Sequence, residues 1–203
     1  MIVVVDYGMG NLGSVLNMIS KVGGHSIASN DPEEILKAEK LILPGVGSFD
    51  QGMSRLDRLG LIGPLEEAVK NRGIPILGFC LGMQLLCEGS DEGSLGGLGW
   101  VQGRCKRFEF QANELRVPHM GWNLLERAKL HDLYTEWTPD SRFYFTHSYH
   151  LVGTNQSDIL AYTTYGMRFV SAVAKENILG LQFHPEKSLR WGMQMLRNYV
   201  HLR

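Results

Sequence analysis

The sequence predicts an α/β protein with a three-layer, doubly wound and mostly parallel sheet that antiparallel strands extend. In the first half, short aliphatic runs alternate with longer helical patterns, which is the βαβ rhythm of a parallel sheet. These runs are continuously apolar, as is typical of strands covered by helices on both faces. After Trp100 the pattern changes to alternating apolar and polar residues with few helical signals, which indicates antiparallel strands.

The first half supplies the parallel strands and the helices between them. Apolar runs predict strands at residues 2–5, 26–28, 40–43 and 75–79. Helical spacing predicts a helix at residues 12–22, which Gly23 and Gly24 end, a second helix that begins at Pro32, and a polar helix over residues 56–72.

The second half supplies strands that we expect to lengthen the same sheet. The alternating segments are residues 101–110, 143–149, 159–165, 170–174 and 178–183. A last helix carries apolar residues at helical spacing from Leu189 to Val200, and Ser188 is the candidate residue to cap its start.

Size and composition favour one domain that spans residues 1–203. The chain has 203 residues, of which 44 % are hydrophobic and 20 % charged, enough for a full core at roughly 100 to 200 residues per domain. A net charge of −1 and the lack of a lysine and arginine run argue against nucleic acid or an anionic membrane as a partner.

Targeting and cysteine usage predict a cytoplasmic protein with reduced thiols. The apolar run at the N-terminus is too short for a secretory signal, Asp6 follows it too early, and no segment approaches the ~20 apolar residues of a membrane span. Three cysteines without a C-x-x-C spacing predict neither a disulfide framework nor a zinc site.

A glycine motif near the N-terminus has two interpretations. Residues 8–13 spell G-x-G-x-x-G between a strand and a helix, which is the pattern of a dinucleotide site. However, Asp6 and Tyr7 separate the apolar run from the first glycine, and a lone match of this kind is weak. We therefore interpret it as a tight turn that needs glycine for backbone reasons, and we predict no cofactor.

Residues 74–86 carry the most informative motif, in which one cysteine stands between two glycines where an apolar strand turns into a helix. This is the pattern of a nucleophile elbow, whose glycines at Gly78 and Gly82 remove bulk that would clash. The helix that follows directs its first N–H groups toward the sulfur of Cys80, which favours the thiolate. A lone cysteine in an apolar stretch is more often inert core, but this turn favours a nucleophile.

A base and its orienting group stand together at the end of the last predicted strand. In an extended segment His184 and Glu186 lie on the same side, and Pro185 between them excludes helix. A carboxylate that fixes the tautomer of an imidazole frees the other ring nitrogen to take the proton of a thiol. Because functional residues collect at the carboxyl ends of strands in open α/β sheets, we predict a Cys80–His184–Glu186 triad.

Other reactive residue types have less specific patterns. Cys87 lies in the predicted helix and Cys105 in an alternating strand, and we interpret Cys87 as core. His147 and His150 would lie on opposite faces of a strand, which is poor metal geometry, so we predict no metal. The segment 118–123 suits a protein interface about as well as a core edge.

The elbow at residues 78–84 and His184-Pro185-Glu186 together resemble the class I glutamine amidotransferase family, whose domains hydrolyse glutamine and pass on ammonia. Segments along essentially the whole chain resemble the branch of that family that supplies ammonia for imidazole glycerol phosphate synthesis. These segments are residues 6–11, 44–49, 118–123, 144–149 and 184–188. Phe79 stands where the family more often has a smaller aliphatic residue, and we expect this to affect packing behind the elbow.

The resemblance implies a role for each site residue. Cys80 would form a γ-glutamyl thioester with glutamine, and His184, oriented by Glu186, would transfer protons. The backbone N–H groups of Leu81 and, after a peptide flip, Val46 would hold the oxyanion. The predicted glutamine-binding residues are Gly47, Gln84, Ser148 and Tyr149.

We also expect a second protein. The motifs occupy the chain from end to end and leave no domain to bind an acceptor, and ammonia released into water is mostly protonated and no longer nucleophilic. The resemblance implies a partner of the (β/α)₈-barrel cyclase type, which would form an imidazole ring and release an aminoimidazole carboxamide ribotide. The predicted interface residues are Asn11, Met120, Trp122, Tyr144 and Lys187.

Two other functions stay open on the sequence. The nearer one is a paralogous glutaminase for a different synthase, such as one that amidates a surface sugar, because the stretch 188–193 does not discriminate between them. The more distant one is a γ-glutamyl hydrolase or a non-catalytic binding module of the same fold. The intact triad argues against the binding module, whereas Gln84 and the segments 118–123 and 144–149 argue against the hydrolase.

Overall fold

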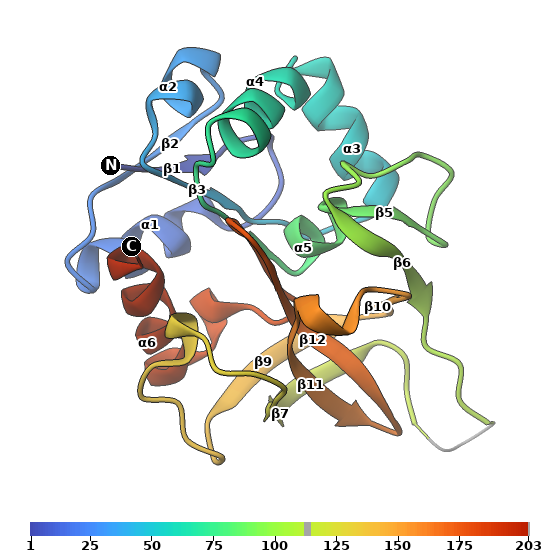
Figure 1. Cartoon of the computed structure of the whole chain (residues 1–203). Helices are drawn as coiled ribbons and strands as arrows, with labels where there is room; N and C mark the ends of the chain where they lie inside the picture. Colours follow the sequence, from blue (N-terminus) through green and yellow to red (C-terminus); the bar gives the residue numbers. More distant parts are fainter. Residues whose placement is uncertain (112–114, 203) are drawn as a thin grey trace.

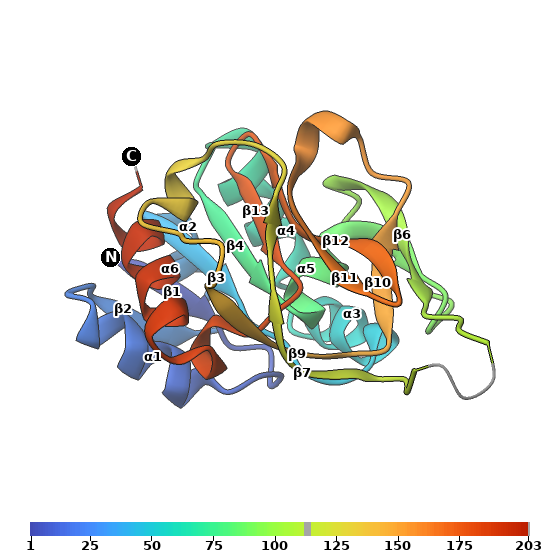
Figure 2. The same ribbon diagram turned by 90° about the horizontal axis from the view of Figure 1, so that it is seen from below.

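A parallel sheet forms one half of the molecule, in a computed structural model that describes residues 1–111 and 115–202. The parallel strands lie side by side in the order β2-β1-β3-β4-β13, and all five are labelled when Figure 1 is turned to the view of Figure 2. Their bounds are β1 (Ile2–Val5), β2 (Ser26–Ser29), β3 (Lys40–Leu43), β4 (Ile76–Phe79) and β13 (Ile178–Leu181). All but β2 are almost fully buried, which explains their continuously apolar sequences.

Further strands continue the sheet past β13. Along the path the order is β12-β10-β6-β5, and β11 pairs with β12 and with β8. Each of these pairs is antiparallel except β5 with β6, which is parallel. The bounds are β5 (Cys87–Ser90), β6 (Val101–Arg107), β8 (Glu126–Arg127), β10 (Tyr149–Val152), β11 (Ile159–Tyr165) and β12 (Met167–Lys175).

Helices cover both faces of the parallel half and enclose two apolar cores. Helices α1 (Leu12–Lys21) and α6 (Leu189–His201) pack on one face. The other face carries α2 (Pro32–Lys37), α3 (Phe49–Arg58), α4 (Ile62–Glu66), the π-helical η1 (Glu67–Asn71) and α5 (Leu81–Leu85). Figures 1 and 2 show these layers, and they confirm the predicted α/β fold with its mostly parallel sheet and antiparallel extension.

A second, two-stranded sheet lies beside the main one. Strands β7 (His119–Leu124) and β9 (Arg142–His147) pair with each other in antiparallel register. The prediction that residues 143–149 add one strand to the main sheet is therefore wrong. Ser148 interrupts the segment, and only the residues after it, in β10, join the main sheet.

Two further predictions of secondary structure need correction. The polar helix begins at Phe49 and not at residue 56, and it breaks at Gly60, whose φ of 65° belongs to the left-handed region. Helix α5 ends at Leu85, so Cys87 begins strand β5 and does not lie in a helix, although it is fully buried as expected.

Three short 3₁₀ turns complete the described elements: η2 (Asp132–Tyr134), η3 (Gln156–Asp158) and η4 (Pro185–Lys187). Within residues 1–111 and 115–202, none of the helices combines the length and apolar character that crossing a membrane requires.

The close contact between α5 and the sheet predicts that the fold does not tolerate a side chain at Gly82 without loss of stability. A Cβ at Gly82 would stand 1.8 Å from the carbonyl oxygen of Leu43, whereas a Cβ at Gly63 in helix α4 would meet nothing within 4 Å. We expect Gly82→Ala to lower the free energy of unfolding by about 1 to 3 kcal/mol or more, because backbone must move. Gly63→Ala should leave it unchanged or raise it by up to about 1 kcal/mol. Urea denaturation measures both, and equal effects would contradict this packing.

Candidate active site

Cys80 occupies a sharp turn between β4 and α5. Its φ of 50° and ψ of −106° are unusual for a residue with a side chain, and such strain persists only where the surroundings enforce it. The flanking glycines permit the turn, because a Cβ at Gly78 would stand 2.7 Å from the backbone of Gly82 and Met83. The strand and the helix therefore approach closely, as the sequence predicts for an elbow.

The sulfur of Cys80 is nearly enclosed. The residue is 7 % exposed, and its backbone N–H donates to the carbonyl of Leu181 at 2.7 Å. Two polar groups contact the sulfur: the carbonyl oxygen of Thr146 and the Nε2 of Gln182, each at 3.8 Å. The thiol thus has one hydrogen-bond acceptor and one donor beside it.

His184 and Glu186 form a buried pair. Strand β13 runs parallel to β4 with Leu181 opposite Phe79, so the residues that follow each strand emerge at the same sheet edge. The Nδ1 of His184 donates to Oε1 of Glu186 at 2.7 Å, since a carboxylate can only accept, and Nε2 is therefore the ring nitrogen left for the reaction. Nε2 is buried and makes no hydrogen bond of ordinary geometry within the described part of the chain.

The electrostatics of this pair favour a protonated imidazole. Burial lowers the pKa of His184, but the neighbouring Cys80 and the hydrogen-bonded Glu186 outweigh burial and raise the pKa to about 9. Because Glu186 occupies Nδ1, Nε2 is the only ring nitrogen of His184 left to interact with Cys80. The predicted nucleophile, base and orienting carboxylate are thus brought together.

Ser188 holds the backbone of this site, although the sequence predicts it as a helix cap. It stands at the N-cap position of α6, but its side chain makes no capping hydrogen bond. Its Oγ donates to the carbonyl of His184 at 2.6 Å and accepts from the N–H of Tyr144 at 3.0 Å. Since the N–H of His184 also donates to the carbonyl of Tyr144, strand β9 fixes His184 through its backbone.

The predicted oxyanion residues lie on two adjoining segments. Leu81 is the first residue of α5, and the first N–H groups of a helix have no partner inside it. The loop of residues 44–47 packs onto this helix start, because a Cβ at Gly45 would stand 2.8 Å from Cβ of Leu81 and 2.9 Å from the nitrogen of Gly82. The hydroxyl of Tyr7 donates to the carbonyl of Pro44 at 2.6 Å and anchors the loop. Val46, at the tip, is 41 % exposed.

The predicted glutamine-binding residues differ in their surroundings. Gly47 adopts a φ of 118° near the methyl group of Met9, and Ser148 and Tyr149 form the junction between β9 and β10. Gln84 is buried, and its Nε2 donates at 3.1 Å both to the carbonyl of Tyr149 and to Oε1 of Gln182. Their roles toward glutamine stay predictions.

Gln182 is a polar contact of Cys80 that we do not predict from the sequence. It is fully buried beside Cys80 and links this cysteine to Gln84. The signal was present, because the alternation that places His184 and Glu186 on one side of an extended segment places Gln182 there as well.

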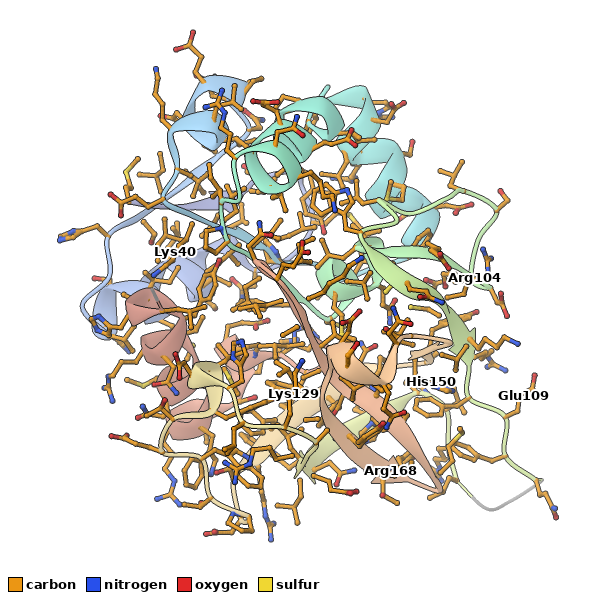
Figure 3. All side chains as sticks on the ribbon, viewed as in Figure 1. Lys40, Arg104, Glu109, Lys129, His150 and Arg168 are labelled. Carbon is orange, nitrogen blue, oxygen red and sulfur yellow. The ribbon has the colours of Figure 1, made fainter. Side chains whose placement is uncertain are left out.

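A cluster of aromatic and histidine rings lies behind the small sheet. His147 and His150 both lie close to the ring of Phe108, with centroids at 5.3 and 4.5 Å, so the prediction of opposite faces is wrong because the chain turns at Ser148 between their strands. Figure 3 labels His150, which is part of strand β10. His147 hydrogen-bonds to His119 at 3.1 Å, and burial lowers the pKa of these two to about 3 and about 4. Both imidazoles are therefore neutral.

The predicted interface residues lie mostly around β7 and β9. His119 of β7 is buried, whereas Met120 is 62 % and Trp122 46 % exposed on the alternate face. The ring of Trp122 lies 5.9 Å from that of Tyr144, and the Nζ of Lys187 lies 5.9 Å from the same tyrosine ring. Asn11 directly precedes helix α1, and its side chain caps this helix by accepting from the N–H of Ser14.

Comparisons with known proteins agree with this geometry. Curated relatives named imidazole glycerol phosphate synthase subunit HisH 2 match almost the whole chain. The one from Methanococcus maripaludis is 49 % identical over 98 % of both chains, and the one from Pseudomonas aeruginosa is 48 % identical over 100 % of both. Among solved structures, a glutamine amidotransferase superposes with a TM-score of 0.75 at 18 % identity, covering 98 % of this chain and 96 % of its own. The structure of PurLQS from Thermotoga maritima superposes with a TM-score of 0.69 at 17 % identity, covering 97 % and 95 %.

The solved structures are too distant in sequence to show more than the fold. Membership of a family is shown by the match of the sequence to a family model. The family described as Glutamine amidotransferase class-I matches residues 3–202. This match extends over both motifs of the site and over the whole sheet. The chain belongs to the class I glutamine amidotransferase family.

Proposed function

We propose that this chain is the glutaminase subunit of an imidazole glycerol phosphate synthase, which hydrolyses glutamine and passes ammonia to a cyclase subunit. The observation that carries the proposal is the strained Cys80 beside the buried His184–Glu186 pair, in a chain 49 % identical over 98 % of its length to a subunit of that name. The products of the complete enzyme would be imidazole glycerol phosphate and an aminoimidazole carboxamide ribotide.

In the proposed reaction, Nε2 of His184 takes up and gives back a proton in each of two steps. The proton that Nε2 of His184 carries comes from the Cys80 thiol, and the resulting thiolate attacks the side-chain amide carbon of glutamine. The carbon–nitrogen bond breaks, Nε2 returns the proton to the leaving nitrogen, and ammonia departs from a γ-glutamyl thioester. Water then gives a proton to Nε2 as its oxygen attacks the thioester, and the carbon–sulfur bond breaks. Nε2 passes that proton to the sulfur, which restores the thiol, and the new carboxyl group loses its proton to solvent as glutamate leaves. A pKa of about 9 for His184 supports its role as the acid that protonates the leaving group.

The contacts of the 44–47 loop support a gate for the oxyanion. The loop lies between Tyr7, which bonds the carbonyl of Pro44, and the start of α5. A displacement of this loop would move the N–H of Val46 relative to Leu81, and loss of one oxyanion donor costs about 10² to 10³ in rate. We propose that partner binding sets this loop, so the chain alone is a poor glutaminase.

The exposed face of β7 supports the proposed partner surface. Apolar side chains that point to solvent at Met120 and Trp122 are typical of interface centres, and Tyr144 and Lys187 extend the face to the turn that carries Glu186. We propose that ammonia released at Cys80 reaches this face past His184, whose backbone N–H donates to the carbonyl of Tyr144 in β9. We propose a cyclase of the (β/α)₈-barrel type as the occupant, with Asn11 at its edge.

Removal of the nucleophile tests both the chemistry and the acceptor. We expect Cys80→Ala to lower glutamine-dependent synthesis by more than about 10³-fold, because no thioester can form. Synthesis from added ammonium salt should persist, since the cyclase itself is intact. The assay combines the chain with a purified histidine-pathway cyclase and its ribotide substrate. If the wild-type chain neither binds nor activates that cyclase, the acceptor is a different synthase, such as the sugar amidating enzyme.

The pH dependence tests the base. Glu186 raises the pKa of His184, so its replacement in Glu186→Gln lowers that pKa from about 9 and deprotonates the imidazole at lower pH. We expect the alkaline limb of kcat/KM for glutamine in the complex to move down by about one unit or more. The exposed Glu109→Gln serves as a matched control with an unchanged limb. An identical profile for the Glu186 variant would remove the carboxylate from the mechanism.

The partner surface is tested by truncating its largest apolar side chain. We expect Trp122→Ala to weaken binding of the cyclase by about 30-fold, the effect of losing a central aromatic contact of about 2 kcal/mol. Leu130→Ala is the matched control, because Leu130 is 81 % exposed but lies outside β7 and β9. Titration calorimetry measures both, and equal affinities for the two variants would place the interface elsewhere.

A further inference from the structure

We propose that Gln182 is a catalytic residue, whose side-chain amide donates a hydrogen bond to the sulfur of Cys80 and stabilises the thiolate. We further infer that Gln84 is a positioning residue, which fixes the orientation of that amide. The inference deepens the proposed function and rests on it, because Cys80 is the nucleophile there. It concerns two buried glutamines, for one of which the sequence predicts only contact with substrate.

The orientation of both amides follows from one backbone carbonyl. The side chain of Gln84 approaches the carbonyl oxygen of Tyr149 at 3.1 Å, and a carbonyl can only accept, so the NH₂ group of Gln84 must face it. The second proton of that NH₂ group then points to the end of Gln182 that lies 3.1 Å away. This end must accept and is therefore Oε1. The NH₂ group of Gln182 is left on the side of the sulfur, 3.8 Å from it.

Burial makes this arrangement hard to reverse. Gln182 is fully buried and Gln84 is nearly so, so neither amide can exchange its partner for water. If the Gln182 amide flipped, two NH₂ groups would face each other and its oxygen would face the sulfur, which leaves buried donors unsatisfied at a cost of about 1 to 3 kcal/mol each. The backbone of Gln182 is held as well, since its N–H donates to the carbonyl of Ser171 at 2.9 Å.

Gln182 stabilises the thiolate because it is a hydrogen-bond donor beside a sulfur that also faces an acceptor. In the thiol form the S–H can donate to the carbonyl of Thr146, 3.8 Å from the sulfur. Once the proton has moved to Nε2 of His184, that carbonyl oxygen faces an anion and opposes it. The NH₂ group of Gln182 then supplies the compensating donor, and a hydrogen bond to the charged form favours ionisation.

The other titratable groups near Cys80 come from separate elements. They are His184 with its partner Glu186, Tyr7 after β1, and Cys105 on β6. None of them bonds to either glutamine side chain, so a change at Gln182 alters the thiolate without removing the base.

The test measures the thiolate directly and needs neither glutamine nor a partner. The rate of alkylation by iodoacetamide is followed from pH 5 to 10 in the full chain, with Cys80→Ala giving the background from Cys87 and Cys105. In Gln182→Met, which keeps the length but lacks the donor, we expect the inflection to move up by about one pH unit and the rate below it to fall about tenfold. Gln182→Leu provides the same test if the methionine variant does not fold.

One control variant and one double variant separate this catalytic role from a merely structural role of Gln182. Gln102→Met, on the exposed side of β6, should leave the alkylation profile unchanged. Gln84→Met should shift it in the same direction as Gln182→Met, and the double variant should shift it no further, because Gln84 acts through Gln182. An unshifted profile in the folded Gln182 variants overturns the proposal. Additive shifts in the double variant overturn the role of Gln84. A chain that lacks glutaminase activity but shows the expected shifts would contradict only the proposed function.

Discussion

The parallel pairing of β13 with β4 is the contact on which the site depends. It sets residues about a hundred positions apart in adjacent register, with Leu181 opposite Phe79, and so both strands end at the same level. The ladder continues into the elbow, where the N–H of Cys80 donates to the carbonyl of Leu181. A slip of register would turn the residues after β13 to the other face of the sheet. Backbone hydrogen bonds thus set the positions of the proposed nucleophile Cys80 and the proposed base His184 relative to each other.

The sequence was sufficient for the parts of the fold that rest on local patterns. Continuous apolar runs predicted β1, β3 and β4 almost to the residue, and the glycines around Cys80 predicted the elbow. The elements it missed depend on contacts distant in sequence. Strand β5 pairs only with β6 among the described strands and is partly made of glycine and polar residues, which carry no strong strand signal. The separate pairing of β7 with β9 follows from a break at Ser148 that no residue preference announces.

In the site, too, local patterns were predictable from the sequence and contacts between distant residues were not. His184 and Glu186 were predicted as a pair because residues two positions apart in an extended segment share a face, and only Pro185 separates them. The position of Gln84 could not be predicted, because its partners Tyr149 and Gln182 lie 65 and 98 residues away. Ser188 is instructive in another way, since the sequence predicted its position at the start of α6 but not that its hydroxyl bonds backward to His184 and across to Tyr144.

The two-stranded sheet of β7 and β9 allows the side chains on its outer face to change during evolution. Tyr144 holds His184 through its main chain, and its side chain faces outward beside Trp122. A main-chain hydrogen bond places no demand on the identity of the side chain. Substitutions on the outer face of β9 can therefore retune which protein docks there, while the geometry of the base stays intact. Such a surface lets one ammonia-producing scaffold acquire new recipients during evolution without rebuilding its chemistry.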